Sequence, residues 1–166
     1  MIISGYQGIG KSSLAGKNNC IDLESGNFWV DGKRADDWYK PYCQIANHLS
    51  QQGYTVFVSS HEVVRKELEK SEEPVFAVFP SIHLKDEWIK KLEERYERTK
   101  LDKDYRALMN AKDRYKENIT ELMQGNLKFY EITRINYHLD DIIDYLEYKS
   151  KNYKYLKDKY LKDKRM

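Results

Sequence analysis

The amino-acid sequence predicts an α/β protein in which helices flank a parallel β-sheet. Short apolar runs that are typical of strands alternate along the chain with longer segments whose apolar residues recur at helical spacing. Such alternation is typical of parallel strands joined by crossover helices. The first apolar run also leads directly into a glycine-rich loop. With 166 residues, 40% of them hydrophobic and 34% charged, the chain fits one domain with a charged surface.

The predicted elements follow one another in the order β-α-β-α-β-α-β-α-α-β-α. Asp36 or Asp37 suits the N-cap of the helix after the second strand, and Gly53 suits its C′ position. Ser59 and Glu62 form a candidate capping box, and the last strand is expected at a sheet edge. The strands are expected at residues 1–4, 20–25, 54–59, 75–79 and 127–132, and the helices at 11–17, 38–49, 61–70, 84–96, 105–123 and from 140 onward.

Residues 5–12, with the sequence GYQGIGKS, match the pattern G-x-x-x-x-G-K-[ST] of the phosphate-binding P-loop. Glycines let such a loop wrap closely around phosphates, with its backbone N–H groups pointing inward. Lys11 is expected to reach the β- and γ-phosphates of a nucleotide, and the Ser12 hydroxyl is expected to bind Mg²⁺. The alternative is an ordinary glycine-rich turn. A strand before the loop and a helical segment after it favour the nucleotide site, with ATP and Mg²⁺ as its ligands.

Polar side chains follow the second predicted strand. Asp22, Glu24 and Ser25 stand where this strand ends. Ligands of open α/β sheets bind outside the carboxyl ends of the strands, so these residues are expected beside the phosphate loop. Asp22 would bind Mg²⁺ or orient an acceptor hydroxyl. No apolar strand ends in Asp-Glu, the pair that usually activates water in ATP-hydrolysing machines, and this absence favours transfer to a bound acceptor.

Three arginines are candidates for stabilising a transferred phosphoryl group. Arg95 and Arg98 are three residues apart on one predicted helix, and Arg106 would come from the next helix. Guanidinium groups stabilise the negative charge that phosphoryl transfer spreads over the phosphate oxygens. A charged helical hairpin that closes over ATP would also exclude water. The alternative is that these arginines pair with neighbouring glutamates on a solvated face.

Two residues after the third strand are candidates for the acceptor side. Arg65 lies one turn into the predicted helix, where it could hold an acceptor phosphate with two hydrogen bonds. Its alternative is a surface ion pair with Glu62 or Glu69. His61 could contact the acceptor as well, although a histidine at a helix start is often a cap or a surface residue.

Two further segments have more than one interpretation. The loop at 26–37 contains Phe28 and Trp29, which could form a lid that stacks on a substrate ring or could be plugs against the core. The stretch at 149–166 is rich in lysine and tyrosine. It is either an amphipathic tail that recruits a partner or a solvated helix end.

Taken together, these motifs make the whole chain resemble the small P-loop kinases of the nucleoside-monophosphate kinase type, which include adenylate, guanylate and thymidylate kinases. It is most similar to the short nucleotide-kinase-like proteins of bacteriophages and prophages. The resemblance implies a single kinase domain over 1–166, with the three-layer P-loop NTPase fold and a five-stranded parallel sheet in the order 2-3-1-4-5. It also implies a helical lid at about 95–115 and a C-terminal helix at about 140–166.

The resemblance extends to individual residues. The family's P-loop corresponds to Gly5, Gln7, Gly8, Ile9, Gly10, Lys11, Ser12 and Ser13, and its lid arginines correspond to Arg95, Arg98 and Arg106. Adenylate kinases carry Asp-Gly-Phe-Pro-Arg after the third strand and thymidylate kinases carry an Asp-Arg pair. This chain has Ser-Ser-His-Glu-Val-Val-Arg there, so the base specificity of those families does not carry over.

The expected activity is ATP-dependent phosphoryl transfer to a nucleoside or deoxynucleoside monophosphate, which gives the diphosphate. One alternative is a kinase for another metabolite or a nucleic-acid end, with Asp22 as general base. Another is a nucleotide-binding module with little turnover, which the lysine- and tyrosine-rich tail favours.

Composition limits the expected partners and compartment. A net charge of +2 gives no support for nucleic acid as a partner, and no apolar run is long enough to span a membrane. Two cysteines without metal-type spacing fit a reducing compartment, so we expect a cytoplasmic protein. A small-molecule nucleotide acceptor is the expected partner, and the protein is expected to be a monomer or a homodimer.

Overall fold

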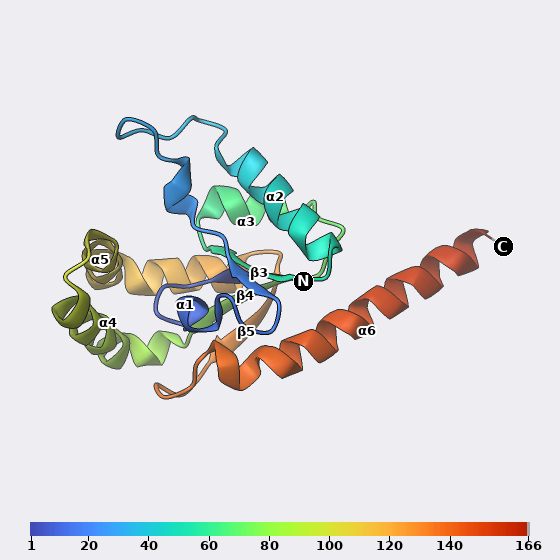
Figure 1. Ribbon diagram of the computed structural model, residues 1–166. Helices are drawn as coiled ribbons and strands as arrows, with labels where there is room; N and C mark the ends of the chain where they lie inside the picture. Colours follow the sequence, from blue (N-terminus) through green and yellow to red (C-terminus); the bar gives the residue numbers. More distant parts are fainter. Residues whose placement is uncertain (166) are drawn as a thin grey trace.

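The computed structural model describes the backbone of residues 1–165 and the side chains of residues 1–157. Its centre is a five-stranded parallel sheet in the order β2-β3-β1-β4-β5, which is the order that the resemblance implies (Figure 1). The strands are β1 (Ile2–Gly5), β2 (Cys20–Asp22), β3 (Thr55–Ser59), β4 (Val75–Pro80) and β5 (Lys128–Ile132). The helices are α1 (Lys11–Leu14), α2 (Tyr39–Gln51), α3 (Glu62–Leu68), α4 (Lys85–Thr99), α5 (Asp102–Gln124) and α6 (Leu139–Arg165), with 3-10 turns η1 (Ser25–Phe28) and η2 (Ile82–Leu84).

Helices cover both faces of the sheet, because successive strand residues enter two different hydrophobic clusters. Ile2 packs with α2 and α3, and so do Val56 and Val58. Ile3 and Phe57 pack in the other cluster, with residues of α1, α4, α5 and α6. Alternating side chains of a strand point to opposite faces, so the strands read as almost continuous apolar runs. This two-sided burial holds the carboxyl ends of the strands in place.

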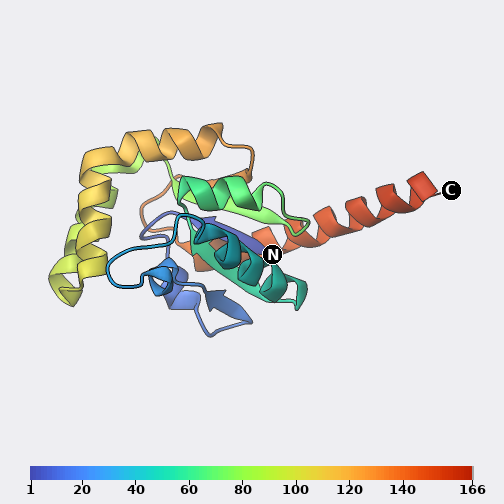
Figure 2. The same ribbon diagram turned by 90° about the horizontal axis from the view of Figure 1, so that it is seen from above.

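The glycine-rich loop at residues 5–12 lies at the point where the chain reverses its direction across the sheet. The chain leaves β1 for β2 and β3 on one side and then crosses back to β4 and β5 on the other. Ligands of parallel α/β proteins bind outside the carboxyl ends of the strands at such a switch point. Figures 1 and 2 place α1 and the α4–α5 pair at this end of the sheet.

Several predicted boundaries are wrong, and each has a local cause. Helix α1 ends at Leu14 instead of residue 17, because Gly16, Asn18 and Asn19 all have positive φ and cannot continue a helix. The predicted second strand ends at Asp22, and the chain turns into η1 at Ser25.

The caps of the next two helices also differ from the prediction. The N-cap of α2 is Trp38 rather than an aspartate. The predicted capping box at α3 does not form, because His61 is the N-cap and the Ser59 hydroxyl lies 2.8 Å from its Nδ1.

The predicted break between the two lid helices is short. Lys100, in the left-handed conformation, ends α4, and α5 begins two residues later. Helix α5 is bent at Arg114, where φ is −131° and ψ is 17°, and Figure 2 shows this bend. Lys100 and Leu101 therefore make a tight turn, and α4 and α5 pack side by side.

Helix α6 has 27 residues and is about 40 Å long. Its first turns are buried against the sheet through Leu139, Ile142 and Leu146. Its far end leads away from the body, on the side opposite to the α4–α5 pair (Figures 1 and 2). Over residues 1–165, none of the helices combines the length and the apolar character that crossing a membrane requires.

Candidate functional site

The loop at residues 5–12 depends on its glycines. Gly8 and Gly10 have φ values of 84° and 104°, in the left-handed region that favours glycine. A Cβ on Gly5 would lie 2.5 Å from Cδ1 of Ile9, because the loop curls back over the end of β1. Ser13, at the loop's end, has an exposed side chain and donates its backbone N–H to Gly10. The glycines that the motif requires are therefore the residues that this backbone path requires.

Three helices hold this loop in place. The indole N–H of Trp88 on α4 donates to the carbonyl oxygen of Gln7 over 3.0 Å. The side-chain amide of Gln7 donates to the carbonyl oxygen of Ala107 on α5 over 2.7 Å. The backbone N–H of Leu139, at the start of α6, donates to the carbonyl oxygen of Ile9 over 2.8 Å. The loop is thus held by α4, α5 and α6.

Lys11 lies folded over the loop. Its ammonium donates to the carbonyl oxygens of Gly5, at 2.7 Å, and Tyr6, at 3.3 Å. Burial lowers the pKa of Lys11 to about 8, against the opposing effect of Asp22 and Glu24. The ammonium is charged at neutral pH and held where an anion inside the loop would meet it.

Ser12 and Asp22 come together as a pair of oxygen donors. The Ser12 hydroxyl lies 3.4 Å from Oδ2 of Asp22, across the gap between α1 and the end of β2. Burial raises the pKa of Asp22, while Lys11 acts in the opposite direction. A hydroxyl and a carboxylate are donors that Mg²⁺ prefers, so this pair fits the metal that the motif implies. Glu24 is exposed and forms an ion pair with Lys103 of α5 at 3.5 Å.

Of the predicted lid arginines, Arg95 comes nearest to the loop. Its charge lies close enough to Lys11 to lower the pKa of that lysine. Its guanidinium nitrogen is 2.6 Å from Oδ1 of Asp104, without the alignment of a hydrogen bond, and the Thr99 hydroxyl donates to the other carboxylate oxygen. Asp104 is 2% exposed, so it fixes Arg95 close to the turn that joins α4 and α5.

Arg98 is not brought to the loop with Arg95. It is exposed and lines a shallow hollow on the surface of α4, shared with Lys90, Glu93, Glu94 and Glu97. Arg106 is exposed on α5, where its charge contributes to lowering the pKa of Arg34. The three arginines therefore lie in three different surroundings.

Arg65 is buried and pairs with neither of the glutamates suggested by its sequence neighbourhood. Its Nε donates to the carbonyl oxygen of Ser60, and its guanidinium contacts the carbonyl oxygen and, at 3.6 Å, the carboxylate of Glu121. These bonds tie α3 to α5. The guanidinium that the sequence assigned to an acceptor phosphate is thus already engaged.

Arg34 takes a position that sequence reasoning did not assign. Its guanidinium lies between two tryptophan rings, 5.1 Å from the centre of Trp29 and 4.2 Å from that of Trp38. It donates to the backbone and hydroxyl oxygens of Ser25, and its Nε is buried without a hydrogen-bond partner among the described residues. His61 packs edge-on against Trp38, and burial, then repulsion from Arg34, lowers the pKa of His61.

Phe28 and Trp29, the two aromatic residues of the loop at 26–37, therefore have different roles: one packs against the core and the other is exposed. Phe28 is a plug, since it packs against Trp38 and Tyr42. Trp29 is 54% exposed and contacts Arg34, as a surface that meets a ligand would. The position of Arg34 between tryptophans five residues before it and four residues after it was the sequence signal for this cluster.

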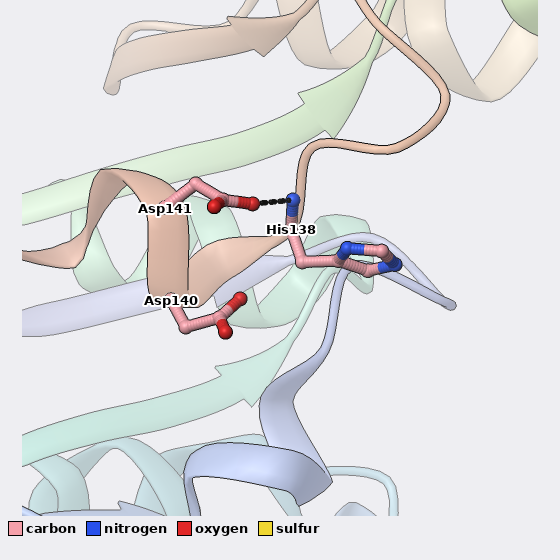
Figure 3. Close-up of side chains that lie close together, drawn as sticks. All are labelled: His138, Asp140 and Asp141. Carbon is pink, nitrogen blue, oxygen red and sulfur yellow. Dashed lines mark hydrogen bonds between the residues drawn. The ribbon is translucent and has the colours of Figure 1, made fainter.

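His138, Asp140 and Asp141 lie together at the start of α6, with one possible ligand atom of each within 4.8 Å of the others (Figure 3). The carboxylate of Asp141 accepts a hydrogen bond from the backbone N–H of His138 over 2.8 Å, which caps the helix. The Cβ of His138 lies 3.5 Å from the position of a Cβ on Gly10, so this turn also borders the phosphate loop. Helix capping explains the position of the Asp141 carboxylate.

Fold and loop together define a parallel α/β protein with a glycine-rich, lysine-bearing loop at the switch point of its sheet. No protein-family model matches the sequence, and no curated protein matches it at a significant level. What the protein does must therefore be inferred from the side chains at this site.

Proposed function

We propose that the protein binds MgATP at the loop of residues 5–13 and transfers the γ-phosphoryl group to a nucleoside or deoxynucleoside monophosphate. The observation that carries this proposal is the convergence of Lys11, Ser12 and Asp22 at a P-loop sequence, with Arg95 beside them. Such a P-loop kinase is a member of the P-loop NTPase fold, and the parallel sheet in the order 2-3-1-4-5 supports that assignment.

Each residue has a separate task in this proposal. The loop N–H groups and the Lys11 ammonium bind the phosphates, and Ser12 with Asp22 holds Mg²⁺. When bound, Mg²⁺ would supply positive charge that offsets the negative charge developing on the phosphate oxygens. Arg95, fixed by Asp104, stabilises the negative charge of the transferring group. An oxygen of the acceptor phosphate forms the new P–O bond, the bond to the β–γ bridging oxygen breaks, and ADP leaves.

The acceptor site of the proposal is the cluster around Arg34. Arg34, Arg106 and His61 supply positive charge or hydrogen-bond donors, and Ser25 supplies a hydroxyl. The exposed ring of Trp29 offers a stacking surface for a base. Arg34 replaces Arg65 as the residue for the acceptor phosphate, since Arg65 is bonded to Ser60 and Glu121.

A kinase for an acceptor hydroxyl is the second candidate, and the burial of Asp22 favours it. Burial raises the pKa of this carboxyl, which makes it a stronger base towards a hydroxyl proton. A monophosphate acceptor needs no base, because its oxygens are already ionised. Asp22→Asn should therefore abolish transfer to a hydroxyl but only weaken transfer to a monophosphate.

The experiment is ADP release from ATP and Mg²⁺, with each common ribo- and deoxyribonucleoside monophosphate added singly. We expect strong stimulation by one or two of them, and loss of this stimulation in Lys11→Met and on removal of Mg²⁺ with EDTA. Stimulation that survives in Lys11→Met would contradict the assignment of the site. If ATP binds but no monophosphate stimulates ADP release, the monophosphate acceptor is wrong and the hydroxyl acceptor takes its place.

A further inference from the structure

Lys91, on α4, has an ammonium group that none of the described residues pairs with. Its Nζ is buried, makes no hydrogen bond, and lies 4.1 Å from the centre of the Trp88 ring. The preceding residue, Lys90, is exposed on the surface of the helix. A buried cation without a hydrogen-bonding partner is unfavourable, and such a group calls for an explanation.

The position of Lys91 explains why its ammonium has no partner. The Trp88 ring under its ammonium donates its N–H to the carbonyl oxygen of Gln7, and its Nε1 lies 3.2 Å from the position of a Cβ on Gly8. A single indole ring thus separates Lys91 from the backbone of the phosphate loop. The unpartnered ammonium therefore lies one ring away from the loop at which the proposed function puts a nucleotide polyphosphate.

Lys91 also belongs to a series of cations that approach this loop. Arg95 is one helical turn further along α4, and its charge acts on both Lys91 and Lys11. Arg95 has Asp104 as its partner, and Lys11 faces Asp22 and Glu24. No carboxylate among the described residues is paired with Lys91. Burial, with a contribution from Arg95, lowers the pKa of Lys91 to about 8, so it is charged at neutral pH.

We propose that Lys91 is a phosphate-binding residue, which donates hydrogen bonds to the polyphosphate of the nucleotide held by the loop of residues 5–13. The inference rests on the proposed nucleotide site and adds a residue to it. The Trp88 ring stores the ammonium when no anion is bound, because the ring face attracts a cation without a hydrogen bond. The ligand class is a nucleoside di- or triphosphate, and a monophosphate lacks the charge to draw Lys91 from the ring.

The test compares Lys91→Met with Lys90→Met by calorimetric titration of MgATP, ADP, AMP and inorganic tripolyphosphate. Methionine keeps the apolar stem of the side chain and removes the charge, and Lys90 is the exposed neighbour on the same helix. We expect Lys91→Met to weaken ATP and tripolyphosphate binding by about 10- to 100-fold, the loss of one charged hydrogen bond. Lys90→Met should bind like the unchanged protein, and AMP binding should be the same in all three.

Tryptophan emission gives a second readout that does not depend on activity. Tripolyphosphate should change the emission of the unchanged protein and of Lys90→Met as the ammonium leaves the Trp88 ring. The same titration should give no such change in Lys91→Met. If ATP binds to Lys91→Met as tightly as to the unchanged protein, while Lys11→Met abolishes binding, the inference about Lys91 is wrong and the nucleotide site stands. If the unchanged protein binds no ATP, the proposed function fails, and the inference fails with it.

A further variant covers the case in which Lys91→Met does not fold. Lys91→Arg keeps a positive charge at every pH that the protein tolerates. Because the unchanged Lys91 loses its proton as the pH rises through about 8, ATP affinity should fall less steeply between pH 7 and pH 9.5 in Lys91→Arg. Identical pH profiles in the two proteins would overturn the inference.

Discussion

The ion pair between Arg95 and Asp104 should respond very differently to removal of one partner or the other. The side chain of Asp104 is 2% exposed and that of Arg95 is 32% exposed, with 2.6 Å between the charged atoms. Arg95→Met leaves a carboxylate that is almost completely buried, with the Thr99 hydroxyl as its remaining donor, and should lower the free energy of unfolding by about 3–5 kcal/mol. Asp104→Asn leaves a guanidinium that water still reaches, and should lower it by about 1–2 kcal/mol.

The double variant is the sharper test of this reasoning. Arg95→Met/Asp104→Asn contains neither charge, so it should be more stable than Arg95→Met alone, although it carries one substitution more. Urea denaturation at pH 7, followed by circular dichroism, measures all three variants. The exposed Arg98→Met, on the same helix, should change stability by less than about 0.5 kcal/mol. The explanation would be refuted if Arg95→Met were no worse than Asp104→Asn, or if the two effects simply added.

Three further predictions concern the loop and its ligands. Gly5→Ala puts a Cβ 2.5 Å from Cδ1 of Ile9, so it should lower the free energy of unfolding by about 1–3 kcal/mol and weaken ATP binding. Gly26→Ala, which has open space around it, should change neither quantity. Thermal melts and ATP titrations measure both variants. ATP affinity should fall as the pH rises through about 8, because burial lowers the pKa of Lys11 to about 8 and the charged ammonium is the form that binds phosphate. An affinity that does not change up to pH 9.5 would contradict this role of Lys11. Asp22→Asn should raise the Mg²⁺ concentration for half-maximal ATP turnover by about tenfold, measured by Mg²⁺ titration; an unchanged requirement would remove Asp22 from the metal site.

The sheet and the backbone path of the glycine-rich loop could be predicted from the sequence because their signals are local. Strands buried on both faces are short, continuous apolar runs, and β3 is recognisable from residues 54–59 alone. The loop requires glycine at fixed positions, and Gly5, Gly8 and Gly10 stand where the backbone needs them. The strand order was predicted from the resemblance to small P-loop kinases and not from a local sequence pattern, and the structure has the same order.

The surroundings of individual side chains could not be predicted, because they depend on residues far apart in the chain. Arg65 was predicted to hold an acceptor phosphate or, as the alternative, to pair with Glu62 or Glu69, yet its partner Glu121 is 56 residues away on α5. Arg34 stood in a loop that has no periodic pattern, so its place between two tryptophans emerged only from the fold. Asp104 was part of a charged stretch in the sequence, and its burial became visible only when α4 and α5 were packed together.

The most direct test of the central claim is a calorimetric titration of ATP into the unchanged protein and into Lys11→Met, with and without Mg²⁺. A nucleotide site built on Lys11, Ser12 and Asp22 predicts saturable binding with one ATP per chain, strengthened by Mg²⁺ and lost in Lys11→Met. Absence of binding to the folded, unchanged protein, or equal binding to Lys11→Met, would contradict the claim that this loop is where the protein holds its nucleotide.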